Sequence, residues 1–406
     1  MKRISLPSFV LKEPGNNPGL RIMNWKVLLL WAGIVIIAGC GKTAEDPVPS
    51  KAGEASLFTL EDVARLLSAV PLEAEQMGEV HDAATASADN GYDEEYLMKD
   101  VFACPGAGVG DSQETKAGKQ YAKPLRDLLL QAAIATRADD DGVAQAMLDS
   151  LAVSDVQIYW PYSNLWDGKA LPVITFDPGN AGDSLNVGYL PTGEKVLVDE
   201  QMARERPVWV VSNNSDAGFT SLEMLRRQDP SWGQGGGDIV IKPRATGKEE
   251  MRTLVLRSFR AHRQFDSWFA GASEFFVKAG SVKNMNFSKD SELLNYRPEV
   301  TDFMIVVRRS QKGENLPFNA VMVSDWDKSL SMIGFMITED DGGTLTDWKC
   351  QLTGKYNSRS YGIELSIPIN SRDDIVWRGS LSRKYVEKYS GEDASFGDVD
   401  LVLELI

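Results

Sequence analysis

The spacing of apolar positions changes part-way along the chain. From about residue 57 to residue 152, apolar residues recur at every third or fourth position, as on one face of a helix. From about residue 155 they fall into short runs bounded by turn residues, which is typical of β-strands. We therefore expect an α+β protein with a small helical domain over 57–152, a β-rich domain over 153–247 and a C-terminal antiparallel β-sandwich over 248–406.

Three helices are expected in the helical domain. Thr59 opens the first with a variant of the capping box, and the apolar face of that helix ends before Pro71. The second begins at Pro124, because proline suits the first helical position, and the third runs over 142–151. The glycine-rich segment 105–111 between the helices lacks the Lys-Ser/Thr of a P-loop, so we interpret it as a flexible loop.

The β-rich domain is expected to contain five strands, with a hairpin turn at Pro191–Gly193. The strands correspond to the apolar runs 156–159, 171–176, 185–190, 195–198 and 208–211. Four aromatic residues near the first strand offer a platform on which a sugar ring could stack: Tyr159, Trp160, Tyr162 and Trp166. Aromatic rings more often fill a core, and that is the preferred interpretation.

The segment before the first helix carries a lipidation signal. An apolar run from Val27 ends in Ile37-Ala38-Gly39-Cys40, which resembles the lipobox of bacterial lipoproteins. The run breaks before the about 20 apolar residues that a transmembrane anchor needs. The resemblance implies that residues 1–39 are an N-terminal extension and signal peptide, that Cys40 carries fatty acyl chains such as palmitate, and that residues 40–56 are a flexible tether.

The location of the protein follows from the same resemblance. Gly41 stands where an Asp commonly retains lipoproteins at the inner membrane, so the outer membrane or the cell surface is implied. The leaflet stays open. The start of translation also stays open, because Met23 followed by Asn-Trp-Lys begins a signal peptide at least as well as Met1 does.

The composition argues against several functions. The chain of 406 residues has a formal net charge of -15, and the part from Cys40 onward is near -19 because five of the six charged residues before it are basic. Without clusters of Lys and Arg, no nucleic-acid partner is expected. The two histidines, His81 and His262, form no zinc motif and no convincing nucleophile triad. Cys104 and Cys350 either pair as a disulfide or remain separate buried thiols.

Acidic residues in the last domain form the strongest candidate site. Asp266 and Glu274 frame the connection between two expected strands, whereas Asp325 and Asp327 end a later strand shortly before Ile333-Gly334. This order resembles C2 domains, although Glu274 stands in place of the usual Asp and no Pro follows it. The resemblance implies a Ca²⁺ site formed by these four carboxylates at one end of the sandwich.

Other parts of the last domain support the expected sandwich. The segment from Glu339 to Gly343 offers further ligands, although a hairpin turn is its simpler interpretation. A strand close to the C-terminus, over 397–405, follows from alternating apolar residues.

Three functions remain open at this point. The first is a noncatalytic lipoprotein of the cell envelope that binds a protein or glycan, with calcium as a stabilising ion. The second is a polysaccharide hydrolase that uses two carboxylates as acid and nucleophile or base. The third is a purely structural component of the envelope, which would need neither a pocket nor a cation site.

Overall fold

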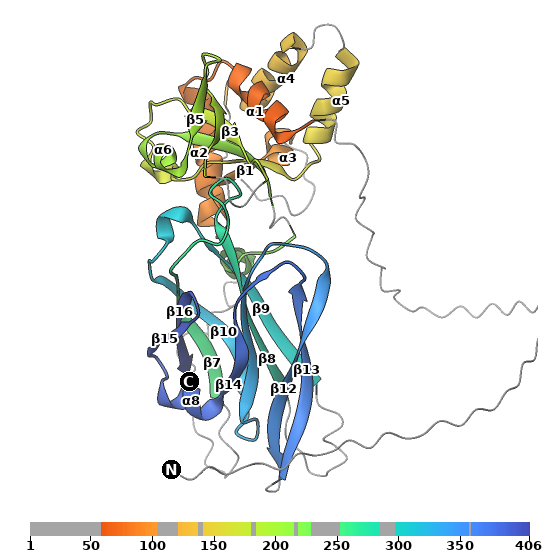
Figure 1. Cartoon of the computed structure of the whole chain (residues 1–406), viewed down its shortest axis with the longest axis vertical. Coiled ribbons are helices and arrows are strands. Elements are labelled where there is room, and N and C mark those ends of the chain that lie inside the picture. The colour runs from red at the N-terminus through yellow and green to blue at the C-terminus, as the bar shows by residue number, and fades with distance from the viewer. Residues whose placement is uncertain are drawn as a thin grey trace, which may run out of the picture. The chain divides into compact units, whose positions relative to one another are not determined.

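The computed structural model describes residues 58–103, 121–136, 141–179, 184–214, 218–228, 252–283, 297–356 and 359–406. The lipobox with Cys40, the tether, Cys104 and the glycine-rich segment 105–111 lie outside these residues. The α+β class is confirmed: helices precede a β-rich region with several antiparallel sheets (Figure 1). No helix in the described part of the chain is long and apolar enough to span a membrane.

The first half of the described chain is a mixed sheet covered by helices. The helices described up to residue 151 are α1 (Leu60–Ala69), α2 (Ala74–Asp89), α3 (Met98–Val101), α4 (Leu125–Thr136) and α5 (Asp141–Leu151). The sheet has the order β1-β2-β6-β3-β4-β5, in which only β3 and β6 pair in parallel. Its strands are β1 (Glu95–Leu97), β2 (Val156–Tyr159), β3 (Val173–Phe176), β4 (Asn186–Tyr189), β5 (Lys195–Val198) and β6 (Val208–Asn213).

One hydrophobic core joins these helices to this sheet. Leu67 of α1, Met77 of α2 and Leu129 of α4 belong to the same buried cluster as Trp160 and Trp209 beside and within the sheet. The boundary expected near residue 152 therefore falls inside one packed unit, to which β1 contributes a strand from the helical side. Of the four aromatic residues considered for sugar stacking, Tyr159, Trp160 and Tyr162 are buried and Trp166 is partly buried, so they are core residues.

Polar residues on buried faces explain why α2 was not expected. The carboxylate of Glu79 is buried in this helix and accepts a hydrogen bond of 2.7 Å from the backbone N–H of Leu125, at the start of α4. Gln76 is also buried, and it donates to the carbonyl of Lys123 over 2.6 Å. Two polar side chains facing the core obscure the apolar period of α2, although they hold the first turn of α4 in place.

The second half is a β-sandwich of two four-stranded antiparallel sheets. One sheet has the order β10-β7-β16-β15, formed by β10 (Leu316–Trp326), β7 (Arg252–Ala261), β16 (Val399–Leu405) and β15 (Asp393–Phe396). The other has the order β14-β11-β8-β9, formed by β14 (Asp374–Ser382), β11 (Met332–Glu339), β8 (Ser273–Lys283) and β9 (Arg297–Val307). Side chains of both sheets, such as Phe259, Phe275 and Phe335, share one core. The expected strand close to the C-terminus is β16.

A hairpin of two long strands covers the second sheet. It consists of β12 (Leu345–Tyr356) and β13 (Arg359–Asn370). Its side chains approach Gly280 and Gly334, which pair with each other across β8 and β11. A Cβ atom built on Gly280 would overlap the Cδ2 atom of Leu365, and one on Gly334 would lie 2.7 Å from the Sγ atom of Cys350. The glycine pair thus creates the flat strip on which the hairpin packs. Cys350 is a free, buried thiol there.

Short elements complete the chain. They are α6 (Glu200–Glu205), α7 (Leu222–Gln228) and α8 (Arg383–Lys388), with 3₁₀ turns at Ser163–Leu165 and Arg309–Gln311.

The glycine pair gives a prediction about stability. Replacing Gly280 with Val should lower the free energy of unfolding by about 2 kcal/mol, because the new methyl groups overlap Leu365 in a packed layer. Gly362→Val in β13 is the matched control, since a Cβ there lies 3.5 Å from its nearest neighbour; it should change stability by no more than about 0.5 kcal/mol. Urea unfolding measures both, and equal effects would contradict the packing argument.

Candidate metal centre

Three carboxylates meet at one end of the sandwich. Asp266 lies in the connection between β7 and β8, Glu274 is the second residue of β8, and Glu339 is the last residue of β11. The register between β8 and β11 sets their proximity: Glu339 pairs with Phe275, and the backbone N–H of Asp340 donates to the carbonyl of Glu274 over 3.0 Å. Pairing of the two strands therefore holds the backbones of Glu274 and Glu339 next to each other whether or not an ion is bound.

The three side chains lie close enough to share one ion. One carboxylate oxygen from each lies within 4.8 Å of the other two. Glu339 is fully buried, Glu274 is 6% exposed and Asp266 is partly buried. When ionised, Glu339 has no hydrogen-bond donor among the described residues that meets normal geometry, and neither does Oδ2 of Asp266, whereas a protonated Glu339 can share its proton with Asp266. A buried charge without partners is costly, so Glu339 must be neutralised by a proton or by a cation.

The electrostatics of the cluster favour a proton when no cation is present. Burial, followed by the neighbouring carboxyl of Asp266, raises the pKa of Glu339 to about 11. Burial also raises the pKa of Asp266 to about 6, although a hydrogen bond from the protonated Glu339 opposes this rise. The charge of Asp341 raises the pKa of both groups further. A divalent cation would replace this proton and let all three carboxylates ionise.

The donor atoms select the class of cation. All three side chains offer carboxylate oxygens, which suit Ca²⁺ or Mg²⁺ better than softer metals. Calcium takes 6 to 8 oxygens, and three carboxylates that bind with one or both oxygens, together with carbonyls and water, provide that number. The residues present therefore fit a calcium ion.

Two of the four expected ligands lie elsewhere, which corrects the expected site. Asp325 is exposed near the end of β10, and Asp327 accepts hydrogen bonds from the backbone N–H and the hydroxyl of Ser329 in a turn, at 2.7 and 2.5 Å. Both precede the first residue of β11, Met332, whereas Glu339 is the last. Seven steps along a strand span about 23 Å, so Asp325 and Asp327 belong to the opposite end of the sandwich.

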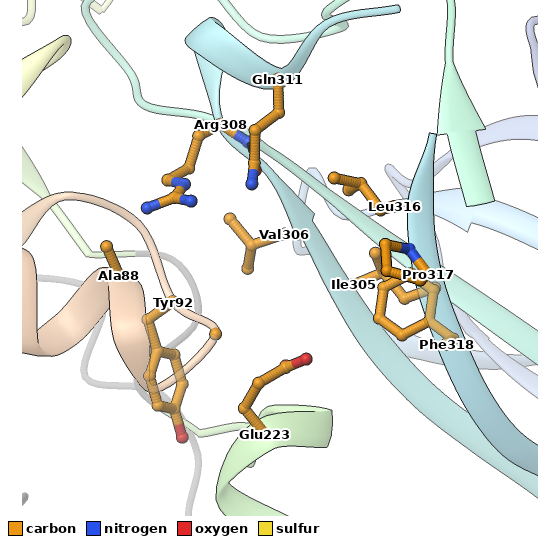
Figure 2. Close-up of a pocket in the computed structure, with 11 residues that line it drawn as sticks. Ala88, Tyr92, Glu223, Ile305, Val306, Arg308, Gln311, Leu316, Pro317 and Phe318 are labelled. Atoms are coloured by element: carbon orange, nitrogen blue, oxygen red, sulfur yellow. Dashed lines mark hydrogen bonds between the residues drawn. The ribbon is translucent and has the colours of Figure 1, made fainter. Parts of the chain in front are cut away.

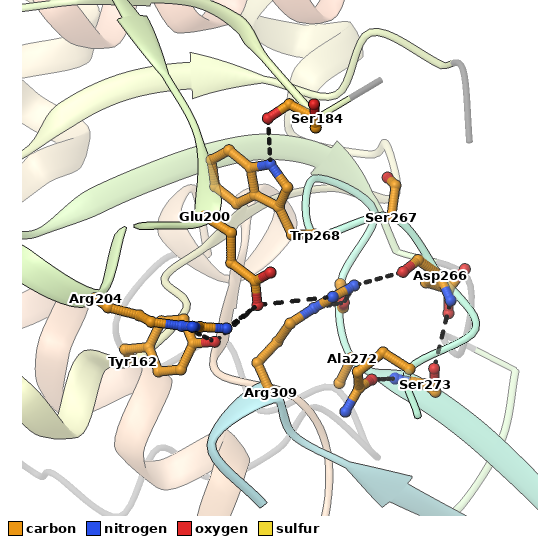
Figure 3. Close-up of polar contacts among 12 residues, drawn as sticks. Tyr162, Ser184, Glu200, Arg204, Asp266, Ser267, Trp268, Ala272, Ser273 and Arg309 are labelled. Atoms are coloured by element: carbon orange, nitrogen blue, oxygen red, sulfur yellow. Dashed lines mark hydrogen bonds and ion pairs between the residues drawn. The ribbon is translucent and has the colours of Figure 1, made fainter. Parts of the chain in front are cut away.

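The loop that carries Asp266 also joins the two halves of the described chain. Trp268 and Phe269 of this loop are buried in one cluster with Tyr159 and Val208 of the six-stranded sheet. The indole N–H of Trp268 donates to the carbonyl of Ser184 over 3.2 Å, as Figure 3 shows. We name residues 262–272 the bridging loop.

Further contacts hold the bridging loop at its end. The backbone N–H of Ala272 donates to the buried carboxylate of Asp93 over 2.8 Å. Arg309, whose side chain is 6% exposed, donates to the carbonyl of Asp266 over 2.7 Å and twice to that of Gly271 over 3.0 Å. The same guanidinium lies 3.9 Å from the carboxylate of Glu200, which belongs to the first half of the described chain (Figure 3). The position of Asp266 thus depends on both halves.

Comparisons with protein families, with curated proteins and with solved structures find no match to this chain. The resemblances to lipoproteins and to C2 domains therefore remain predictions that rest on the residues quoted for them.

The titration of the cluster gives a prediction about stability and pH. The pKa of Glu339 is higher in the folded protein than its ordinary value of 4.5. The folded state therefore retains a proton that the unfolded state has lost, and stability falls as pH rises above 4.5, by up to about 1.4 kcal/mol per pH unit for one proton. In chelator, native protein should lose stability between pH 5 and pH 8 relative to Glu339→Gln, which stays neutral throughout.

Denaturant unfolding at several pH values measures this difference. In saturating Ca²⁺, the difference in stability between native protein and Glu339→Gln should no longer vary with pH, because the cation takes the place of the proton in neutralising the carboxylate of Glu339. A difference between native protein and Glu339→Gln that does not vary with pH in chelator would contradict the assignment.

Proposed function

We propose that this protein is a lipid-anchored lipoprotein of the outer membrane or cell surface, and that it acts as a noncatalytic binding module stabilised by Ca²⁺. The observation that carries the cation part is the convergence of the fully buried carboxylate of Glu339 with those of Asp266 and Glu274, with one oxygen of each within 4.8 Å of the others. A divalent cation would neutralise all three carboxylates at once.

The same geometry favours binding over hydrolysis of polysaccharide. Glycosidases of the usual kind hold two carboxyl groups about 5 to 9.5 Å apart on either side of the scissile bond, where substrate reaches both. Here the three carboxylates approach within 4.8 Å, and Glu339 is fully buried. A sugar ring has no access to a fully buried side chain, so the cluster suits an ion better than a substrate.

The structural role of the ion follows from the bridging loop. Asp266 belongs to the loop whose Trp268 and Phe269 pack against the six-stranded sheet. A cation held by Asp266 and by the sandwich residues Glu274 and Glu339 would restrain this loop from its sandwich side. It would bind the folded state alone, and so stabilise it by mass action.

The anchor part of the proposal is supported by sequence. Cys40 follows the apolar run at the position that a lipobox requires, and two or more acyl chains hold a protein stably at a membrane. The acidic balance of the chain, with 58 acidic and 43 basic side chains, argues against a nucleic-acid partner. A protein or a glycan in the envelope remains the proposed class of ligand.

Calcium should raise the melting temperature of the purified protein. At 100 times its dissociation constant, an ion that binds only the folded state adds about 2.7 kcal/mol, which corresponds to roughly 5 °C for a domain of this size. Glu339→Gln should abolish the shift, because it removes one negative ligand from a site of three. Circular dichroism in millimolar Ca²⁺ and in chelator measures the effect.

The matched control is the double variant Asp325→Asn, Asp327→Asn. These residues lie at the opposite end of β11, so the variant should keep the calcium shift of the native protein. Loss of the shift in the control but not in Glu339→Gln would restore the ligand set of the C2 resemblance and contradict the cluster. No shift in native protein would remove calcium from the proposed function.

Lipidation should depend on Cys40 alone among the three cysteines. Cells grown with an alkyne analogue of palmitate should yield labelled native protein in the membrane fraction, whereas Cys40→Ala should be unlabelled and released from membranes. Cys104→Ala is the control and should keep both label and membrane location. Labelling that survives Cys40→Ala would contradict the anchor.

A further inference from the structure

A pocket of about 210 Å³ lies beside the sandwich, apart from the carboxylate cluster. It is bordered by the end of α2 and the residues after it, by α7, and by the end of β9 and the start of β10 (Figure 2). A pocket of this volume has room for several water molecules. This suits a group the size of one amino-acid residue.

One side of the pocket presents hydrogen-bond donors. The guanidinium of Arg308 points toward the pocket in Figure 2, and its charge opposes the rise that burial causes in the pKa of Asp93 and of Glu94. The side-chain oxygen of Gln311 accepts a hydrogen bond of 3.1 Å from the backbone N–H of Arg308. Its amide nitrogen, also a donor, faces the pocket (Figure 2). Donors from both residues match the two oxygens of a carboxylate.

The neighbouring wall is apolar. Ile305 and Val306 come from β9, and Leu316, Pro317 and Phe318 come from β10. Pro317 has no backbone N–H, so this stretch of β10 offers fewer polar groups to the pocket. An aliphatic group next to the carboxylate would bury its surface against these side chains.

Glu223 places a negative charge across the pocket from Arg308 (Figure 2). Its carboxylate occupies the space that the missing side chain of Gly91 leaves: a Cβ atom there would overlap it, and Gly91 has a φ of +81° that favours glycine. The carboxylate lies 3.8 Å from the guanidinium of Arg226. A second negative charge on a ligand would be repelled by Glu223, which disfavours phosphates and dicarboxylates.

We propose that this pocket binds a monocarboxylate attached to an apolar group of about one residue, as found at the C-terminus of a peptide or in a short fatty acid. The carboxylate lies against Arg308 and Gln311, and the apolar group lies against Leu316, Pro317 and Phe318. This inference rests on the proposed noncatalytic binding function, whose ligand class it narrows, and it does not require the calcium site.

The test is a titration of the full chain, purified in detergent and saturated with calcium, followed by ligand-observed NMR. N-acetyl-L-leucine represents a peptide C-terminus and 4-methylpentanoate represents a short fatty acid. A dissociation constant on the order of millimolar is expected for ligands of this size. N-acetyl-L-leucinamide, which lacks the charge, should bind at least about tenfold more weakly, and the tighter of the two acids identifies the source.

Variants test the assigned residues. Arg308→Met should weaken binding of the acid by about tenfold or more, whereas Arg308→Lys should retain part of it. Lys312→Met is the matched control, because it removes the same charge from an exposed residue outside the pocket and should leave binding unchanged. Glu223→Gln should improve binding of the dianion glutarate relative to the monocarboxylates.

Two results would overturn the proposal: equal binding of N-acetyl-L-leucine and its amide, or equal losses in Arg308→Met and Lys312→Met. The calcium shift in melting, measured on the same samples, separates this proposal from the previous one. Absent carboxylate binding with an intact calcium shift overturns the pocket alone. Carboxylate binding without a calcium shift supports the pocket and removes calcium from the proposed function.

Discussion

Burial of one carboxylate, that of Glu339, is the constraint on which the end of the sandwich depends. The residue is fully buried, and the nearest group that can share its proton is another carboxyl, that of Asp266. An unpaired ionised carboxylate costs several kcal/mol in such a place, so the state of the cluster is decided by what neutralises it. Pairing of β11 with β8 continues to Glu339 itself, so its backbone cannot move away without breaking the last pair of the ladder. Strand pairing therefore holds a titratable group in a buried position, where either a proton or a cation must neutralise it.

The bridging loop extends this local constraint to the rest of the described chain. Asp266 stands at the cluster, and two residues later Trp268 begins a contact with the core of the six-stranded sheet. Arg309 donates to carbonyls at both ends of this contact, those of Asp266 and Gly271. The bridging loop is held both by the sandwich and by the six-stranded sheet. If the three carboxylates lost their fixed positions, the contact between these two parts would therefore loosen, and not only one turn. Burial of two aromatic side chains, each worth about 1.5 to 3 kcal/mol, makes that junction energetically substantial.

Local patterns in the sequence were sufficient for most strands but not for the assembly of the site. Alternating or continuous apolar runs predicted β2 and β5 to the residue, and Thr59 with Asp62 forms the capping box expected for α1. The proximity of Asp266 and Glu274 also followed, since one short loop separates them. The placement of Asp325 and Asp327 did not follow, because it depends on the antiparallel pairing of β10 with β7, which puts the end of β10 beside the start of β7 and away from the bridging loop. The sequence indicated Glu339 only as the first residue of an expected hairpin turn that ends at Gly343.

The two proposed sites are adjacent through consecutive residues. Arg308 points its guanidinium toward the pocket, whereas Arg309 donates to the loop that carries Asp266. Backbone movement of the 3₁₀ turn that begins at Arg309 would therefore shift both side chains together. Linkage then imposes a condition: if calcium changes the affinity for a carboxylate, the carboxylate must change the affinity for calcium by the same factor. A coupling of this kind needs no long pathway, because a single peptide unit separates the residue that faces one ligand from the residue that positions the other.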